Sequence, residues 1–458
     1  MSEQATTPRR HVSAVYVAML AVGMVVGAGI FKSPALVADA AGSPFWLFAA
    51  WIIGGVITLI GSLCYAELAT TFPSAGGDYH FLRLAYGRGL AFLFAWTRFA
   101  VINAGSIALL GYVLGDYLNV VLPLGAHGAA IYAALSVVVL TGFNLRGTGK
   151  GHDAADYGLT GLEVVGLLAM AAAALALIVQ GVPAAESLGL DAVAAPPPSF
   201  GYALVYALLA FGGWSEVATL SAEVRDPRRG MVRALVLAAV LITALYLIVN
   251  WAFWYGLGTE GLAGASAPAA DLMSKAFGRW AGLLTALAIA FAVITSINAT
   301  IVVGARTTFA CAQEWPVLAR VGVWDETKQS PVAAIWAQGV VSLALVIFGA
   351  FYKGFITLVD YTAPVYWLFL ALSGTALIVL RLRQPAAERP FRAPLYPVLP
   401  LLFIASSAAM LVSSVSYVTS ESGAGALVSL GVLASGVLIL AAVALASRAS
   451  TRPRLEKL

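Results

Sequence analysis

Charged side chains make up only 10% of this 458-residue sequence, and histidine and cysteine occur four times and twice. Soluble domains ordinarily contain about 25% charged residues, so the composition excludes a water-soluble globular protein. Both cysteines, Cys64 and Cys311, stand in apolar stretches, which argues against an external disulfide framework. No HExxH, GxSxG, GxxxxGK[ST] or CxxC pattern occurs, so the apparatus of metal-dependent, acyl-transfer or ATP-driven chemistry is absent. We therefore expect that the protein is not an enzyme and that it binds no metal and no cofactor.

Apolar residues make up 61% of the chain and recur in long runs separated by short polar turns. A bilayer core requires about 20 apolar residues per helix. The runs predict an all-α membrane protein with twelve spans, embedded in the lipid bilayer of the plasma or inner membrane. The predicted spans are 13–40, 44–71, 87–121, 127–144, 155–180, 199–222, 230–257, 279–312, 331–350, 354–381, 396–418 and 425–446.

The net charge of +4 reflects the distribution of Lys and Arg between the two sides of the membrane rather than a nucleic-acid surface. With a cytoplasmic N-terminus, the basic residues outside are Lys32, Lys275, Arg279 and Lys353, and the other 22 of the 26 are inside. The positive-inside rule therefore predicts that both termini are cytoplasmic.

Two glycine clusters interrupt otherwise apolar spans. Gly27, Ala28 and Gly29 fall near the middle of the first span, and Gly212 and Gly213 near the middle of the sixth. Paired glycines are a common site of helix interruption. These positions correspond if spans 1–5 and 6–10 are two repeats, and matched breaks of this kind indicate a midplane binding site in an inverted-repeat transporter.

Unwound backbone would be costly in lipid unless a polar group satisfies it. Amides at the start of each second half-helix suit a carboxylate, and carbonyls at the end of each first half-helix suit an ammonium group. The alternative is close helix packing, because Gly23 and Gly27 form a small-xxx-small motif.

Several motifs resemble the amino acid–polyamine–organocation superfamily of transporters. They are GAGIFKSP from Gly27, AELATTFPSAGGDYHFLRLAYG from Ala66, LAFGGWSEVATLSAEVRDP from Leu209, GARTTFA from Gly304 and RPFRAPLYPVLP from Arg389. The stretch AWTRFAVINAGSIA in the third span is most similar to the L-type amino acid transporter branch.

The resemblance implies a five-plus-five inverted repeat with two additional C-terminal helices. It divides the chain into a cytoplasmic tail, two repeats, a pair of helices and a second tail, at 1–12, 13–190, 191–385, 386–447 and 448–458. It also implies that substrate contacts come from the first and sixth helices. The implied contacts are Val25, Gly27, Ala28, Gly29, Ile30, Leu209, Ala210, Phe211 and Gly212.

Two departures from the L-type pattern bear on gate and partner. That branch often has an aromatic gate where Leu209 stands, although Phe211 follows two residues later. Animal relatives join a heavy chain through an external cysteine after the third span, and the turn at 118–128 has none. We therefore expect no covalent heavy-chain partner.

Polar groups within the spans supply further candidates, because ionisable residues at membrane depth are expensive. Glu163 aligns with a fifth-helix lysine of several bacterial relatives and is a candidate proton or cation carrier; alternatively it pairs with a loop cation. Glu216 is a second candidate coupling acid or a hydrogen-bonding partner of a neighbouring helix. Asn298 lines the pocket or joins two helices. Glu67 resembles a gate residue, with a salt bridge to a loop arginine as the simpler account.

The combined prediction is a secondary active transporter of free, neutral L-amino acids that works by alternating access. Proton symport is the favoured coupling, with amino acid exchange or sodium symport as alternatives. A membrane amino acid sensor would keep the same pocket without turnover. A channel is disfavoured because the spans lack a continuous polar face.

Overall fold

The chain is described by a computed structural model over residues 14–74, 76–147, 153–188, 195–222, 230–315, 318–421 and 424–450. These residues are almost entirely helical, and the β-pairing found among them is one isolated bridge between Asp325 and Ser330. The predicted all-α class is confirmed for this part of the chain.

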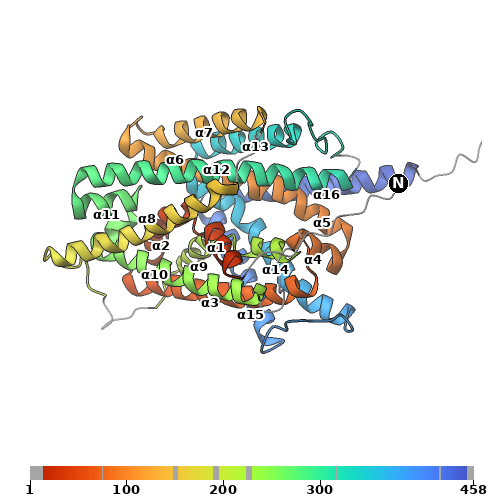
Figure 1. Cartoon of the computed structure of the whole chain (residues 1–458), viewed down its shortest axis with the longest axis horizontal. Helices are drawn as coiled ribbons and strands as arrows, with labels where there is room; N and C mark the ends of the chain where they lie inside the picture. The colour runs from red at the N-terminus through yellow and green to blue at the C-terminus, as the bar shows by residue number, and fades with distance from the viewer. Residues whose placement is uncertain are drawn as a thin grey trace, which may run out of the picture.

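The helices follow one another along the chain as labelled in Figure 1. They are α1 (Ala14–Val25), the 3₁₀ helix η1 (Ala28–Phe31), α2 (Ser33–Ala41), α3 (Pro44–Thr71), α4 (Gly77–Tyr86), α5 (Arg88–Thr97), the π-helix η2 (Arg98–Asn103), α6 (Ala104–Val121), α7 (Gly128–Leu145), α8 (Asp153–Val179), α9 (Phe200–Ala210), the 3₁₀ helix η4 (Trp214–Ala222), α10 (Val232–Ala263), α11 (Pro268–Phe277), α12 (Arg279–Glu314), α13 (Val332–Ala350), α14 (Phe355–Arg383), α15 (Val398–Glu421) and α16 (Ala424–Ser450).

Nine helical segments among the described residues are long and apolar enough to cross a bilayer. They coincide with nine of the twelve predicted spans. Two further predicted spans are represented by shorter apolar stretches at Val164–Val179 and Leu427–Ala442. The first predicted span is divided into α1 and α2, each too short to cross alone. The chain is therefore a multi-pass membrane protein, and the exact count of twelve stays a prediction.

The long helices α3, α10 and α12 run along the long axis of the bundle, with α1 and α9 between them (Figure 1). Helix α1 packs on α10, and α9 packs on α2 and α3. The two divided spans thus occupy the interior of the bundle. We call the end that carries α4 the α4 end and the end that carries α2 the α2 end.

Both predicted glycine interruptions are present in the structure. Helix α1 stops at Val25, and Gly27 is extended, with φ −116° and ψ −166°. Helix α9 stops at Ala210, and Gly213 follows with φ 103°, a conformation that favours glycine because it has no Cβ. The chain then continues as η1 and α2 toward one end, and as η4 toward the other.

Candidate functional site

The two helix interruptions contact each other. A Cβ built on Gly29 would lie 3.6 Å from the Cα of Ala210. The hydroxyl of Tyr246, on α10, lies 3.0 Å from the carbonyl oxygen of Val25 and 2.9 Å from that of Ala210. A single phenol group therefore serves the last carbonyl of α1 and the last carbonyl of α9.

The interruptions also leave space next to the backbone. A Cβ on Gly27 would meet no heavy atom of its surroundings within 4 Å. Gly27, Gly29, Leu209 and Gly212 are partly exposed, although they lie in the interior of the bundle. Their neighbours are buried; these are Val25, Ile30, Ala210 and Phe211. Open space beside Gly27 does not fit the alternative that this glycine is needed for close helix packing.

The side chain of Phe211, directly after the last residue of α9, is held by aromatic packing. Its ring packs on Trp51 and Tyr246, with centroid distances of 6.0 and 5.0 Å, and is fully buried. Gly54 gives it room, because a Cβ there would lie 3.1 Å from the Phe211 ring. Two positions before this buried ring, Leu209 of α9 is partly exposed.

The free ends of the short helices carry the polar groups of the site. The first amides of any helix have no partner inside it, so those of η1 are available next to Gly27. The partial positive charge at that terminus suits an anion. The last carbonyls of α1 and α9 carry partial negative charge; that of Val25 accepts from the N–H of Gly27 and from Tyr246, and that of Ala210 accepts from Tyr246. Backbone polarity of both signs therefore lies within one small region.

The ionisable residues closest in sequence to the interruptions are already paired. Lys32, just after η1, lies 2.7 Å from Asp116 of α6 and donates to the carbonyl oxygen of Ser266 at 3.2 Å. Glu216, in η4, accepts from Arg98 of η2 at 2.7 Å. The first pair joins the segment after η1 to α6, and the second joins η4 to η2.

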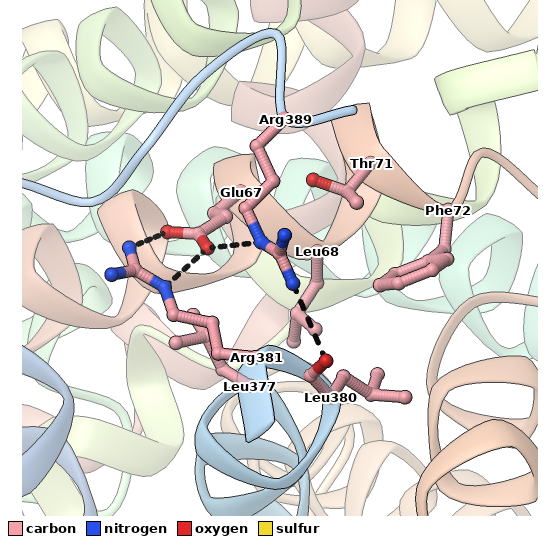
Figure 2. A pocket seen from close by; sticks show the side chains of 8 residues that line it. All are labelled: Glu67, Leu68, Thr71, Phe72, Leu377, Leu380, Arg381 and Arg389. Carbon is pink, nitrogen blue, oxygen red and sulfur yellow. Dashed lines mark hydrogen bonds and ion pairs between the residues drawn. The ribbon is translucent and has the colours of Figure 1, made fainter. Parts of the chain in front are cut away.

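Glu67 forms a separate ionic cluster at the α4 end. Its carboxylate accepts from Arg381 at 2.7 and 2.5 Å and from the backbone N–H of Ala393 at 2.7 Å, and Arg389 lies 3.6 Å away. Figure 2 shows Glu67 between the two arginines. The salt bridges expected for Glu67 are present, and they tie α3 to α14 and to the segment before α15.

The remaining candidates are bonded to other helices or have side chains outside the described part of the structure. The amide oxygen of Asn298, on α12, accepts from Asn144 of α7 at 2.7 Å, which is the helix-joining contact considered for it. The backbone of Glu163 belongs to α8, and its side chain lies outside the described part of the structure. Asp360, near the start of α14, is buried and hydrogen-bonded by Tyr202 of α9.

Two features of the site were not anticipated from the sequence. Tyr246 is one aromatic residue in an apolar run, and nothing near it in the chain indicates that it reaches both interruptions. Asp78, at the start of α4, accepts hydrogen bonds from Tyr65 of α3 and Ser373 of α14. Its position directly after two glycines was the available signal for a turn.

Comparison with known proteins agrees with this architecture. The sequence pattern of the amino acid permease family matches residues 12–433. The chain belongs to the amino acid permease family. Its apolar helices identify this permease as a multi-pass membrane protein. Its family identifies it as an amino acid transporter rather than an enzyme.

Individual relatives are similar to this permease over most of its length. The serine/threonine exchanger SteT of Bacillus subtilis (strain 168) is 26% identical over 430 residues, or 92% of this chain and 95% of the relative. The human large neutral amino acids transporter small subunit 2 is 28% identical over 408 residues, or 86% and 74%. The mouse Asc-type amino acid transporter 1 is 25% identical over 406 residues, or 86% and 75%. The resemblance to the L-type branch is therefore confirmed.

Proposed function

We propose that this permease is a secondary transporter of free, neutral L-amino acids that recognises the α-ammonium and α-carboxylate groups through the two helix interruptions. The observation that carries the proposal is the contact of the interruptions, with Gly29 against Ala210 and Tyr246 bonded to both. The carboxylate binds the amides that begin η1. The ammonium group binds carbonyls at the ends of α1 and α9.

The charges around the site support a neutral substrate. Lys32 and Glu216 are each neutralised by a partner at 2.7 Å. A charged substrate side chain would have to break one of these pairs or remain uncompensated, which is costly away from water. An apolar or hydroxylated side chain would instead lie against Leu209 and the open space beside Gly27.

Competition in proteoliposomes tests this recognition. Uptake of a radiolabelled neutral amino acid should be inhibited by other neutral L-amino acids. It should not be inhibited by their amides or N-acetyl derivatives, because each modification removes one of the two recognised charges. Equal inhibition by the modified and parent compounds would contradict backbone recognition. Binding without any flux in either direction would instead identify an amino acid sensor.

We also propose that the permease works by alternating access of two inverted repeats and that both of its termini are cytoplasmic. In this orientation the α4 end faces the cytoplasm, where the arginines of the Glu67 cluster follow the positive-inside rule. The human relative is named a small subunit. Residues 118–128 of this permease contain no cysteine, so we propose that it works without a disulfide-linked partner.

Proton symport is the proposed coupling, and Glu163 is its proposed proton carrier. Protonation in one state and ionisation in another would make inward flux respond to a pH gradient. Glu163→Gln would mimic the protonated form and abolish that response while substrate is still bound. If transport at fixed pH requires sodium, the coupling ion is sodium rather than a proton. Wild-type uptake into empty liposomes that ignores both gradients would exclude Glu163 as a coupling residue.

Exchange is the second candidate, because the Bacillus subtilis relative is named an exchanger. It predicts flux only when amino acid is present on both sides of the membrane. Liposomes loaded with unlabelled amino acid, compared with empty ones under the same ion gradients, distinguish the two modes directly.

A further inference from the structure

Asp78 lies where four other elements meet at the α4 end. It is the second residue of α4 and is partly exposed. Tyr65 of α3 and Ser373 of α14 donate hydrogen bonds to it. The charged groups that face it are Arg98 of η2 and Glu216 of η4, and Tyr366 of α14 also interacts with its charge.

The hydrogen bonds of Asp78 leave one carboxylate oxygen for a proton. Tyr65 and Ser373 both donate to Oδ1, at 2.5 and 2.7 Å. No hydrogen bond from the described residues reaches Oδ2. A proton can therefore add to Oδ2 without breaking either bond.

The charges near Asp78 do not balance. Arg98 is the cation of the cluster, and its Nη2 is bonded to Glu216 at 2.7 Å. Within the described part of the chain, no basic group lies within 4 Å of Asp78. The Nε of Arg98 is buried and has no hydrogen-bond partner. The guanidinium of Arg98 is thus bonded to Glu216, and the charge of ionised Asp78 acts on it from farther away in competition with Glu216.

This environment shifts the titration of Asp78 toward neutral pH. Burial raises its pKa to about 6, and the charge of Glu216 acts in the same direction. The hydrogen bonds from Tyr65 and Ser373 and the charge of Arg98 oppose the shift, because they stabilise the carboxylate.

The cluster is connected to the second half of the interrupted sixth span. The Arg98 to Glu216 pair ties η4 to η2. The backbone N–H of Ser74, just before α4, donates to Ser221 of η4 at 3.1 Å. At the other end, a Cβ on Gly212 would lie 3.8 Å from the hydroxyl of Tyr366. Tyr366, which interacts with the charges of Asp78 and Glu216, therefore also lies beside the proposed substrate site.

We propose that Asp78 is a proton-binding site that controls how firmly η4 is held at the α4 end. Protonation removes the carboxylate that competes with Glu216, so Arg98 binds Glu216 more strongly and η4 is released less often. Ionisation weakens that hold and lets η4 move. This inference rests on the proposed transport function, and it is distinct from a driving proton gradient because it acts at equal pH on both sides.

The transport test is exchange at symmetric pH. Liposomes are loaded with unlabelled L-serine, L-alanine and L-leucine, and entry of each labelled compound is followed between about pH 5 and about pH 7.5. The wild type should slow about threefold to fivefold on acidification, the size of one ion-pair interaction, with its midpoint near 6. Asp78→Asn, which lacks the titrating group, should be equally slow throughout. Asp39→Asn, an exposed aspartate at the α2 end, is the matched control and should behave as the wild type.

A second variant separates a titrating role from a structural one. Tyr65→Phe removes a hydrogen bond that favours the ionised form, so the midpoint should move upward by about one pH unit. A merely structural role for Tyr65 would change the rate but not the midpoint. A wild-type rate that is independent of pH, or an Asp78→Asn profile that keeps the wild-type midpoint, would overturn the proposal.

Infrared difference spectroscopy on the purified protein gives a readout that does not depend on transport. The titration is made in a Glu163→Gln background, which removes the other proposed proton carrier. Acidification should produce a protonated-carboxyl band with a midpoint near 6 when Asp78 is present, with or without Asp39→Asn, but not when Asp78→Asn is added. Persistence of that band in Asp78→Asn rejects the proton site. Absence of exchange with all three probes rejects the proposed function instead, and the infrared titration then still decides whether Asp78 binds the proton.

Discussion

Replacing Tyr246 by Phe should weaken substrate binding more than its small chemical change suggests. The hydroxyl is buried and lies 3.0 and 2.9 Å from the carbonyl oxygens of Val25 and Ala210. Phenylalanine keeps the ring contacts with Trp51 and Phe211. The substitution therefore removes a hydroxyl that is hydrogen-bonded to both helix interruptions and preserves the packing around it.

The magnitude follows from the hydrogen bonds lost. A typical hydrogen bond contributes about 0.5–1.5 kcal/mol net, and a buried group left unsatisfied costs about 1–3 kcal/mol. One hydroxyl proton is shared between two carbonyls, so a loss of about 1–2 kcal/mol is reasonable. If that loss falls on the substrate-binding arrangement, the dissociation constant should rise about 5–30-fold.

Tyr255→Phe is a matched control on the same helix. Its hydroxyl donates to the carbonyl oxygen of Val182 at 2.7 Å, away from both interruptions. Ligand binding by isothermal titration and thermal unfolding should be measured for both variants. We expect Tyr255→Phe to lose stability with unchanged affinity. Equal affinities in the two variants would show that the bridge at Tyr246 is structural only.

Two further substitutions test the site and the α4 end. Gly27→Ala should fold normally and weaken binding, because the added methyl group enters open space. Gly212→Ala should weaken binding and also destabilise the fold, because its Cβ would lie 2.8 Å from the carbonyl oxygen of Leu209. Thermal unfolding and ligand titration measure the two effects. Glu67→Gln should lower the free energy of unfolding by about 3–5 kcal/mol, because it breaks a buried ion pair. Glu314→Gln, in an exposed pair, should lower it by less than about 1 kcal/mol. Misfolding of Gly27→Ala would refute the first expectation, and equal losses in the two glutamine variants would refute the second.

The interruptions could be predicted because their cause is local. Glycine clusters weaken a helix wherever they stand, and Gly213 takes a φ of 103° that other residues rarely adopt. Their matched positions in the first and sixth spans gave the expectation of a central site. The paired state of Glu67 was also foreseeable, because RPFRAP supplies arginines next to an apolar helix end.

The partners of buried polar groups could not be predicted, since they are remote in the chain. Tyr65 and Ser373 stand 13 and 295 positions from Asp78. Tyr246 reaches carbonyls 221 and 36 positions away. Helix α4 was also missed, because ten residues between two spans resemble a loop by length and hydropathy. Without the packing of the bundle, the sequence does not distinguish these residues from other polar groups.

The pairing of charges around the site has a consequence for electrical measurements. Lys32 with Asp116 and Arg98 with Glu216 are each neutral as pairs, and in the proposed binding mode the zwitterion held by backbone dipoles adds no net charge. Movement of a neutral amino acid by itself therefore carries no current through this permease. Exchange of two neutral amino acids is electroneutral for the same reason. Any substrate-dependent current in proteoliposomes must then come from a coupled ion, so the charge moved per amino acid distinguishes symport from exchange independently of the flux measurements.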